Sequence, residues 1–367
     1  MEKNRIVVKI GSSSLTNSNG EIDYDKLRDH VAAIAELKKQ RREVVLVSSG
    51  AVACGFKQMG YTQKPVTLKG RQGAAAVGQG LLMQAYAEAL AMHHITPAQL
   101  LLTRTDFQSQ VSYQNAQQTI EELLERDILP IINENDTVSV KELTFGDNDM
   151  LSALVSGLVH ANQLIILTDI NGLYSANPKK DASAIRFDHL TEITEELLGY
   201  ATAEGSKMGT GGMQSKLFAA KTAFDLGVKV FIGSGSGKGK LLEILCGDGD
   251  GTYIEAAHQQ ALSSKKQWIS LFSESVGAIY IDRGAEEALL EKGKSLLPAG
   301  VYLVHGDFEA GDVVEVYRER VLLGKGETLY SAQQLQQAMG KKTQELTQIN
   351  TVVIHRDRFV ATLKEEI

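Results

Sequence analysis

The residues of this sequence that could do chemistry stand at the ends of short apolar runs. The first run, Ile6–Ile10, is rich in β-branched residues, as a buried parallel strand would be, yet it contains Lys9 and opens into Gly11 and three serines. A buried lysine loses hydration unless an anion lies beside it, and a Gly-Ser turn presents backbone N–H groups. The run therefore predicts either an anion site or a lysine on an edge strand of the sheet that reaches water, and the rest of the sequence favours the first.

Charged and polar residues follow later apolar runs in the same way. The set comprises the lysines Lys9 and Lys216, the carboxylates Asp136, Asp147, Asp149 and Asp169, the amides Asn133 and Asn148, and the hydroxyls Ser12, Ser49 and Thr168. No serine or cysteine is paired with a histidine in a recognisable motif, and His93-His94 lacks the spacing of a metal site. Phosphoryl transfer fits this set, because its transition state needs positioning and charge neutralisation more than a covalent nucleophile. Lysines would bind phosphate oxygens, and aspartates would hold Mg²⁺ or orient the lysines.

The missing general base also bears on the phosphoryl acceptor. A hydroxyl acceptor would usually need a base, whereas a carboxylate with a pKa of about 4 is already ionised at neutral pH and can attack unaided. The residue set is therefore compatible with a kinase that forms an acyl phosphate.

A glycine-rich segment, residues 207–216, leads into a helix expected over 217–226. Backbone N–H groups at a helix N-terminus and the helix dipole both favour an anion. The Walker A pattern GxxxxGK[ST] is absent from the sequence, and Gly233–Lys240 (GSGSGKGK) also fails its spacing. Residues 207–216 are thus predicted to be a phosphate-binding loop of another kind.

Strands and helices are expected to alternate through the first ~255 residues. The expected strands cover 6–10, 44–47, 100–103, 128–132 and 164–169, and the expected helices cover 24–40, 113–123 and 151–158. This alternation predicts a parallel sheet with helices on both faces, where ligands lie beyond the carboxyl ends of the strands. The polar segments at 9–14, 48–51, 133–136 and 168–169 should therefore meet at one rim. The Ala- and Gly-rich stretch 73–90 predicts a helix packed closely against another element.

The composition is that of a globular protein, and the length of the chain allows one large domain and a second, smaller one. The 367 residues carry a net charge of −7, which argues mildly against nucleic-acid binding, and Cys54 and Cys246 are too few for a disulfide framework. No apolar run approaches the ~20 residues of a membrane span, so we expect a cytoplasmic protein. A polar stretch, 259–266, is followed from Val276 by short strands and a helix at 331–339, as in a small β-barrel-like domain.

Six motifs occur in a fixed order: VVKIGSSSLT, VLVSSGAVACG, INENDTV, FGDND, LTDINGLYSANP and GTGGMQSK. Together they resemble the amino-acid kinase family, most closely its members that act in proline biosynthesis. The run LEKGKSLLPAGV resembles the PUA domain that such bacterial enzymes often carry. The resemblance implies a three-layer αβα sandwich with a mainly parallel sheet, and a small C-terminal PUA domain. It places a catalytic domain at 1–258, a linker at 259–275, the PUA domain at 276–355 and a tail at 356–367.

The resemblance implies ATP-dependent phosphorylation of the γ-carboxylate of L-glutamate, with Mg²⁺ carried mainly by the ATP phosphates. The catalytic residues would be Lys9, Lys216 and Asp149. Glutamate would contact Ser49, Asn133, Asp136 and Asn148. The nucleotide would contact residues of three segments: Lys9, Gly11, Ser12, Thr168, Asp169, Thr210, Gly211, Gly212, Met213, Gln214, Ser215 and Lys216. Residues 112–116 and 179–190 match the family less closely. The same resemblance implies a homo-oligomer (dimer or tetramer), feedback inhibition by proline, and handover of the product to glutamyl phosphate reductase.

Two alternatives remain open at this point. Acetylglutamate kinase, aspartokinase and UMP kinase share the lysines and the glycine loop, but INENDTV followed by GDND, together with the PUA-like tail, argues against them. An RNA-binding protein is the other, since PUA-like domains occur on such proteins. Between Val276 and His355, however, acidic residues outnumber basic ones and no aromatic-plus-arginine platform is evident, so no nucleic-acid partner is expected.

Overall fold

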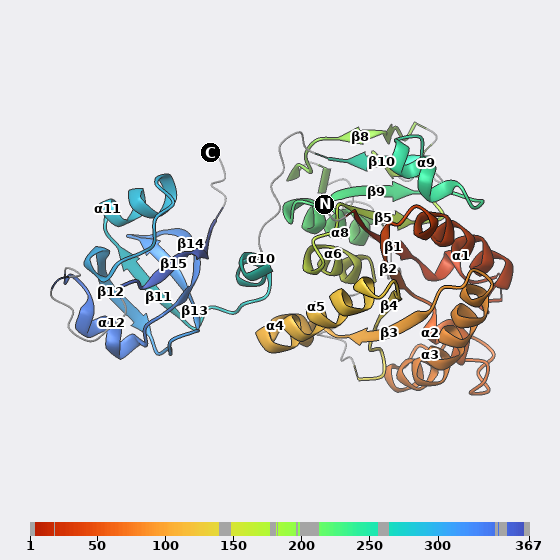
Figure 1. Cartoon of the computed structure of the whole chain (residues 1–367), viewed down its shortest axis with the longest axis horizontal. Helices are drawn as coiled ribbons and strands as arrows, with labels where there is room; N and C mark the ends of the chain where they lie inside the picture. Colours follow the sequence, from red (N-terminus) through yellow and green to blue (C-terminus); the bar gives the residue numbers. More distant parts are fainter. Residues whose placement is uncertain are drawn as a thin grey trace. The chain divides into compact units, whose positions relative to one another are not determined.

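The structure of the chain is a computed structural model (Figure 1). It describes residues 4–17, 19–138, 148–176, 181, 183–195, 197–198, 213–255, 264–341, 344 and 351–362. The chain divides into two compact units: Met1–Asp106 with Gln114–Ala261, and Phe107–Tyr113 with Leu262–Ile367. In the part of the chain that the structure describes, no helix is long and apolar enough to span a membrane.

The first unit is built on an eight-stranded sheet with the order β3-β4-β2-β1-β5-β9-β10-β8. The strands are β1 (Arg5–Ile10), β2 (Glu43–Ser48), β3 (Pro97–Leu102), β4 (Leu129–Glu134), β5 (Gln163–Leu167), β8 (His189–Leu190), β9 (Lys229–Gly233) and β10 (Gly251–Ile254). All neighbours pair in parallel except β9 and β10. The mainly parallel sheet predicted from the strand–helix alternation is confirmed, and the carboxyl ends of β1, β2, β4 and β5 share one edge.

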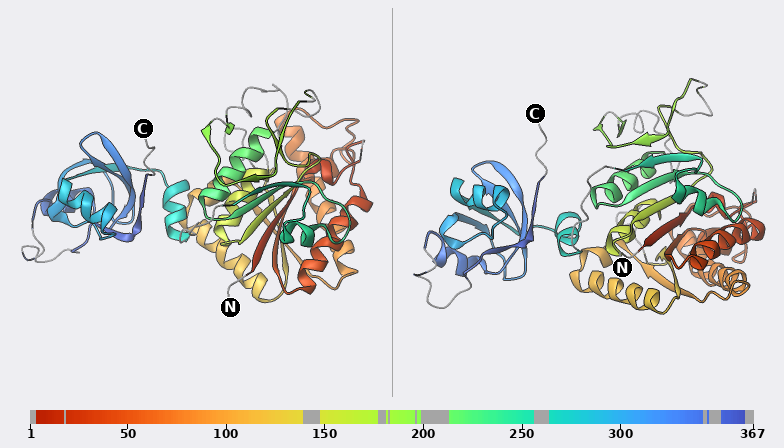
Figure 2. Two further views of the ribbon diagram at one scale, coloured as in Figure 1. Left: turned by 90° about the horizontal axis from the view of Figure 1, so that it is seen from above. Right: turned by 45° about the horizontal axis from the view of Figure 1, so that its top comes forward.

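Helices cover both faces of this sheet (Figure 2). On one face α6 (Asn148–Leu158) crosses the central strands and packs against α8 (Met213–Asp225); on the other, α1 (Tyr24–Lys39) packs against α3 (Leu68–Ala91) and α9 (Lys240–Cys246). The side chains of Leu27, Val31, Ile34 and Leu37 are fully buried, as their helical spacing in α1 predicted. Two further helices, α4 (Arg104–Gln108) and α5 (Gln110–Glu125), lie between β3 and β4 in the chain.

Glycines let α2 (Ala51–Gly55) and α3 touch backbone to backbone. A Cβ atom built on Gly55 would lie 2.0 Å from the carbonyl oxygen of Ala74, and one built on Gly78 would lie 1.8 Å from that of Ala51. Such contacts exclude any side chain at either position. The close packing expected of stretch 73–90 is thus confirmed, and it fixes α3 beside the end of β2.

Replacing Gly78 by alanine should therefore destabilise the protein by about 3 kcal/mol or more, because the new methyl group overlaps the Ala51 carbonyl. Gly80, in the same helix, has no atom within 4 Å of its built Cβ. Gly80→Ala should leave stability unchanged or raise it by up to ~1 kcal/mol, the helix preference for alanine. Urea unfolding midpoints of the two variants would measure the difference, and equal stabilities would contradict the packing argument.

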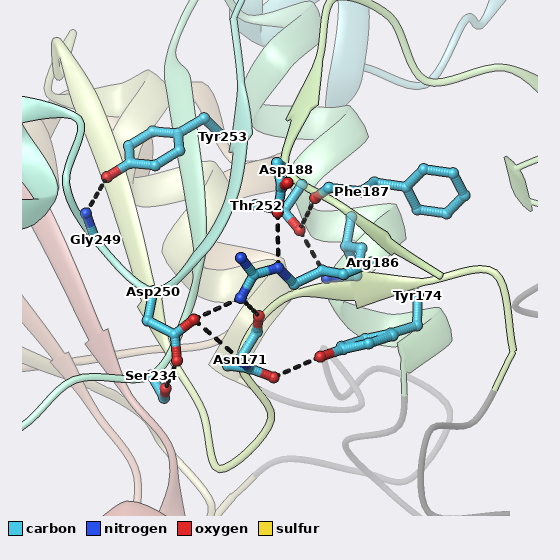
Figure 3. A network of polar contacts seen from close by, with 11 residues as sticks. Asn171, Tyr174, Arg186, Phe187, Asp188, Ser234, Gly249, Asp250, Thr252 and Tyr253 are labelled. Atoms are coloured by element: carbon cyan, nitrogen blue, oxygen red, sulfur yellow. Dashed lines mark hydrogen bonds and ion pairs between the residues drawn. The ribbon is translucent and has the colours of Figure 1, made fainter. Parts of the chain in front are cut away.

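A polar network fastens a small hairpin, β6 (Leu173–Tyr174) with β7 (Arg186–Phe187), to the sheet (Figure 3). The Arg186 guanidinium pairs with Asp188, at 2.7 Å, and with Asp250. Asp250 also accepts hydrogen bonds from Asn171, at 3.1 Å, and from Ser234, at 3.2 Å. Because Ser234 directly follows β9, the network fixes the segment after β5 against the carboxyl end of β9.

The second unit holds a five-stranded sheet with the order β12-β11-β13-β14-β15. The strands are β11 (Gly277–Ile281), β12 (Val301–Gly306), β13 (Val313–Arg318), β14 (Val321–Thr328) and β15 (Ile354–Ala361). All pairs are antiparallel except β11 with β13. The unit also contains α11 (Arg283–Glu286), α12 (Ala332–Ala338) and α10 (Ser264–Leu271), which lies within the stretch expected to be a linker.

Three tyrosines lie side by side across the sheet of the second unit. The ring centroid of Tyr280 is 5.4 Å from that of Tyr317 and 6.4 Å from that of Tyr302. The spacing of these tyrosines in the sequence does not predict the grouping, because each ring comes from a different strand and only the strand pairing brings them together. The Tyr317 hydroxyl donates to the Glu315 carboxylate at 2.8 Å, so the platform carries a negative charge beside its rings.

Candidate active site

Three charged side chains meet at the carboxyl end of β1. Lys9 Nζ lies 2.5 Å from Asp149 Oδ1, and Lys216 Nζ lies 3.1 Å from Asp149 Oδ2. Asp149 stands in the first turn of α6 and Lys216 in the first turn of α8, so the packing of these two helices brings both residues to the strand. The edge-strand alternative for Lys9 is wrong, since β1 lies inside the sheet between β2 and β5, and this side chain is only 2% exposed.

The electrostatics of this triad favour a bound anion. Burial alone would raise the pKa of Asp149, but the ammonium groups of Lys9 and Lys216 outweigh burial and hold that pKa well below its ordinary value. Asp149 therefore stays ionised and pairs with two cations. One positive charge is left in excess among the three side chains, in a place that is largely out of water.

The serine turn follows directly after Lys9. Gly11 precedes a short 3₁₀ turn, Ser12–Ser14, and both Gly11 and Ser12 are partly exposed. A Cβ atom built on Gly11 would lie 3.4 Å from Lys9 Nζ. Any side chain at this position would occupy space beside the lysine ammonium, so glycine keeps that space open for a ligand.

A buried cluster of amides and hydroxyls lies at the ends of β2 and β4. Asn148 Nδ2 is within hydrogen-bonding distance of Ser49 Oγ, at 2.8 Å, and of Asn133 Oδ1, at 2.8 Å. Asn133 Nδ2 in turn donates to Gln79 Oε1 at 2.8 Å. Because its nitrogen is engaged in this way, Asn148 turns its oxygen Oδ1 elsewhere. That buried oxygen accepts no hydrogen bond from any described residue.

Gln79 is a site residue that the sequence analysis missed. It lies in α3 and is 8% exposed, and its carbonyl sets the orientation of the Asn133 amide. No motif contains it, and a lone glutamine in an Ala- and Gly-rich helix has no distinctive spacing. The clue in the sequence was weak: a polar side chain between the apolar positions of a helix expected to be tightly packed.

Asp136 lies just beyond the end of β4 and is partly buried. Burial raises the pKa of its carboxyl group, and the guanidinium of Arg71 acts in the opposite direction. A carboxylate whose burial is only partly compensated favours an additional cation nearby. An ammonium group of a ligand would meet that need.

The residues expected to bind nucleotide are placed in part. Thr168 follows β5, its backbone N–H donates to the Gly233 carbonyl at 2.9 Å, and Asp169 next to it is exposed. Ser215 Oγ donates to Asp149 Oδ2 at 3.1 Å, which joins the start of α8 to the triad. Met213 and Gln214 open α8. Asp147, Thr210, Gly211 and Gly212 lie outside the described residues.

Comparison with known proteins places this arrangement in a family. A family model described as the amino acid kinase family matches residues 4–234, the stretch that holds the triad and every strand of the sheet except β10. The chain belongs to the amino acid kinase family. A PUA domain model matches residues 277–349, so this amino acid kinase has the C-terminal PUA domain that the sequence resemblance implied.

Curated relatives of this amino acid kinase match along nearly its whole length. Glutamate 5-kinase 1 of Bacillus licheniformis is 60% identical over 98% of this chain and 99% of its own. Glutamate 5-kinase 1 of Bacillus subtilis is 59% identical over the same shares. Among solved structures, carbamate kinase from Giardia lamblia bound to AMP-PNP has a TM-score of 0.50 at 17% identity. That match covers 70% of this chain and 99% of the carbamate kinase, and it shows a shared fold.

Proposed function

We propose that this chain transfers the γ-phosphoryl group of ATP to the γ-carboxylate of L-glutamate, which gives glutamyl 5-phosphate, as the first step of proline biosynthesis. The observation that carries the proposal is the Lys9–Asp149–Lys216 triad at the rim of the parallel sheet. The names of its full-length relatives support glutamate as the acceptor.

In the proposed reaction a γ-carboxylate oxygen of glutamate forms a bond to the γ-phosphorus of ATP. The bond between that phosphorus and the β–γ bridging oxygen breaks, and ADP leaves with the electron pair. The attacking carboxylate is already ionised, so no base is required. Lys9 and Lys216 neutralise the phosphoryl oxygens during transfer, and Asp149 holds the two ammonium groups in position.

The two ends of the rim would hold the two substrates. Glutamate would contact Ser49, Asn133, Asp136 and Asn148; its α-ammonium group can donate to Asn148 Oδ1, which accepts nothing from the described residues, and can pair with Asp136. The ATP phosphates would pass Gly11 and Ser12, with the rest of the nucleotide toward Thr168, Asp169 and the start of α8. Mg²⁺ bound to those phosphates would neutralise part of their charge.

A trapping assay tests the acceptor. Hydroxylamine converts an acyl phosphate into a hydroxamate, so incubation with ATP, Mg²⁺ and hydroxylamine should give hydroxamate with L-glutamate. N-Acetylglutamate, aspartate and UMP, tested for ADP release in parallel, should give far less turnover. Preference for any of these three over glutamate would reject the proposal in favour of another amino acid kinase activity.

Replacing Asp136 by asparagine should chiefly raise the KM for glutamate, by about tenfold or more, because one ionic contact to the α-ammonium group is lost. The KM for ATP should stay within about twofold. Asp127→Asn is a matched control, since it removes an exposed carboxylate that pairs with Lys38. If only the KM for ATP rose, Asp136 would lie at the nucleotide end of the rim, and the proposed places of glutamate and ATP would have to be exchanged.

Further properties are proposed on the resemblance alone: a cytoplasmic location, assembly into a dimer or tetramer, inhibition by proline, and handover of the unstable product to glutamyl phosphate reductase. Binding of RNA by the second unit is not proposed. Although its three tyrosines could stack with bases, the adjacent Glu315 and the excess of acidic residues oppose a polyanion.

A further inference from the structure

A second buried cluster of charged groups lies between α1 and α9, outside the triad. Lys240, the first residue of α9, is 2% exposed, and its Nζ lies 2.5 Å from Asp29 Oδ2 and 3.0 Å from His30 Nδ1. The other ring nitrogen of His30, Nε2, lies 3.1 Å from the backbone oxygen of Ser14. This series of contacts therefore runs from α9 through α1 to the serine turn after β1.

The contacts determine the form of the His30 ring. An ammonium group can only donate, so His30 Nδ1 accepts from Lys240 and the ring proton stands on Nε2. From there it is donated to the Ser14 carbonyl. Burial lowers the pKa of His30 to about 4, and the charge of Lys240 acts in the same direction, so the ring is neutral at physiological pH.

Carbonyl groups of the serine turn, and of Thr16 just after it, accept hydrogen bonds from α1 and from the Thr16 hydroxyl. Besides the His30 bond to Ser14, Lys26 Nζ donates to the carbonyl of Thr16 at 2.8 Å, and Thr16 Oγ1 donates to that of Ser12 at 2.9 Å. In a trans peptide the C=O and N–H groups point in opposite directions. The peptide plane of the Ser14 carbonyl carries the N–H of Leu15, which donates to the Ser12 carbonyl at 3.1 Å, so the His30 bond helps to hold the turn in its closed 3₁₀ form.

The second glycine-rich segment, Gly233–Lys240, is built around the same cluster. The backbone N–H of Gly237 donates to Asp29 Oδ1 at 2.8 Å, with φ at +80°. A Cβ atom built on Gly235 would lie 3.1 Å from Lys240 Cβ. The glycines thus let the loop wrap closely around the Lys240–Asp29 pair, which explains a motif that fits no phosphate-loop pattern.

We propose that Lys240 and His30 are positioning residues for the phosphate path: Lys240 sets the tautomer of His30, and His30 holds the turn Gly11–Ser14 in the shape that receives the ATP phosphates. Neither residue touches the substrate. The inference rests on the proposed function, which brings those phosphates to this turn. Replacing either residue should therefore change the KM for ATP and not the KM for glutamate.

Lys240→Met keeps the length of the side chain and removes the donor to His30. We expect the KM for ATP and the Kd for Mg-ADP to rise about tenfold, the equivalent of one charge-assisted hydrogen bond, with the KM for glutamate within about twofold. His30→Leu should raise the KM for ATP and the Kd for Mg-ADP by a similar factor. His30→Gln, whose amide can still donate to Ser14 and accept from Lys240, should recover most of the nucleotide affinity.

Lys38→Met is the matched control. Like His30, Lys38 lies on α1; it stands in the last turn of that helix, its side chain is 7% exposed, and it pairs with Asp127. This variant should match wild type in both KM values. If Lys38→Met and Lys240→Met have the same effect, or if the KM values for ATP and glutamate rise equally, the cluster only supports packing and the inference is wrong.

Calorimetric binding of Mg-ADP to the wild-type chain separates the inference from the proposed function. A wild-type chain that binds no nucleotide would reject the proposed function itself. A wild-type chain that binds Mg-ADP, with unchanged affinity in Lys240→Met and His30→Leu, would reject only the positioning role. Should Lys240→Met fail to fold, the comparison of His30→Leu with His30→Gln decides the question on the same criterion.

Discussion

Lys216→Ala should lower kcat about a thousandfold and leave the fold intact. The ammonium group of Lys216 is one of two that can neutralise the transferred phosphoryl group, and it pairs with Asp149 Oδ2 at 3.1 Å. The fold should survive because Asp149 keeps its ion pair with Lys9 at 2.5 Å. Hydroxamate formation at saturating ATP and glutamate measures kcat, and thermal melting measures the fold.

Lys221→Ala provides the matched control for this loss of charge. Lys221 lies further along α8, is partly exposed, and pairs with Asp225 at 3.1 Å. Its removal should leave turnover within about twofold, as expected for a surface ion pair. Near-normal kcat in Lys216→Ala would remove that lysine from the proposed mechanism.

Asp149→Asn should abolish most activity and also destabilise the protein by about 3–5 kcal/mol, the usual effect of removing one partner from a buried ion pair. Asp149 is fully buried between two ammonium groups, and the neutral amide would leave both without their shared counter-ion. Asp225→Asn removes an exposed partner of a lysine and should change stability by less than ~1 kcal/mol. Urea unfolding of both variants at pH 7 measures the contrast.

The Asp149 carboxylate should also make the stability of the folded chain fall at acid pH. An unfolded aspartate titrates near 3.8, and the two lysines hold the pKa of Asp149 below that in the folded chain, so its stabilisation is complete above about pH 5. It is lost as the pH falls through the folded value. The stability of Asp149→Asn should therefore depend less steeply on pH between 5 and 3. A variant as stable as wild type at pH 7 would show that the two lysines do not need this carboxylate.

Features set by local patterns could be predicted from the sequence. The β-branched run of β1, the amphipathic spacing of α1 and the polar segments at strand ends each follow from a few neighbouring residues. The parallel sheet then brings Lys9, Ser49, Asn133 and Thr168 to one edge by topology alone. This is why residues far apart in the chain could be assigned to one rim before the structure was known.

Features that depend on contact between distant elements could not be predicted. Gln79 matters because α3 lies beside β4, and Lys240 matters because α9 packs on α1; neither residue has a local signature. The tyrosine platform appears only when β11, β12 and β13 are paired. In each case the feature depends on a tertiary contact, which the spacing of residues along the chain does not predict.

The second unit also limits how this protein can be divided. Its aromatic core joins Phe272 of the stretch after α10 to Phe107 and Tyr113, with ring centroids 5.2 and 5.8 Å apart, and the Trp268 indole donates to the Gln108 carbonyl at 3.2 Å. In the chain, however, residues 107–113 lie between β3 and β4, two strands of the first unit. The second unit is therefore not one continuous stretch of the chain. A chimera that exchanges the second unit between relatives must carry residues 107–113 along with α10, or the aromatic contacts of Phe272 will join residues that come from two different proteins.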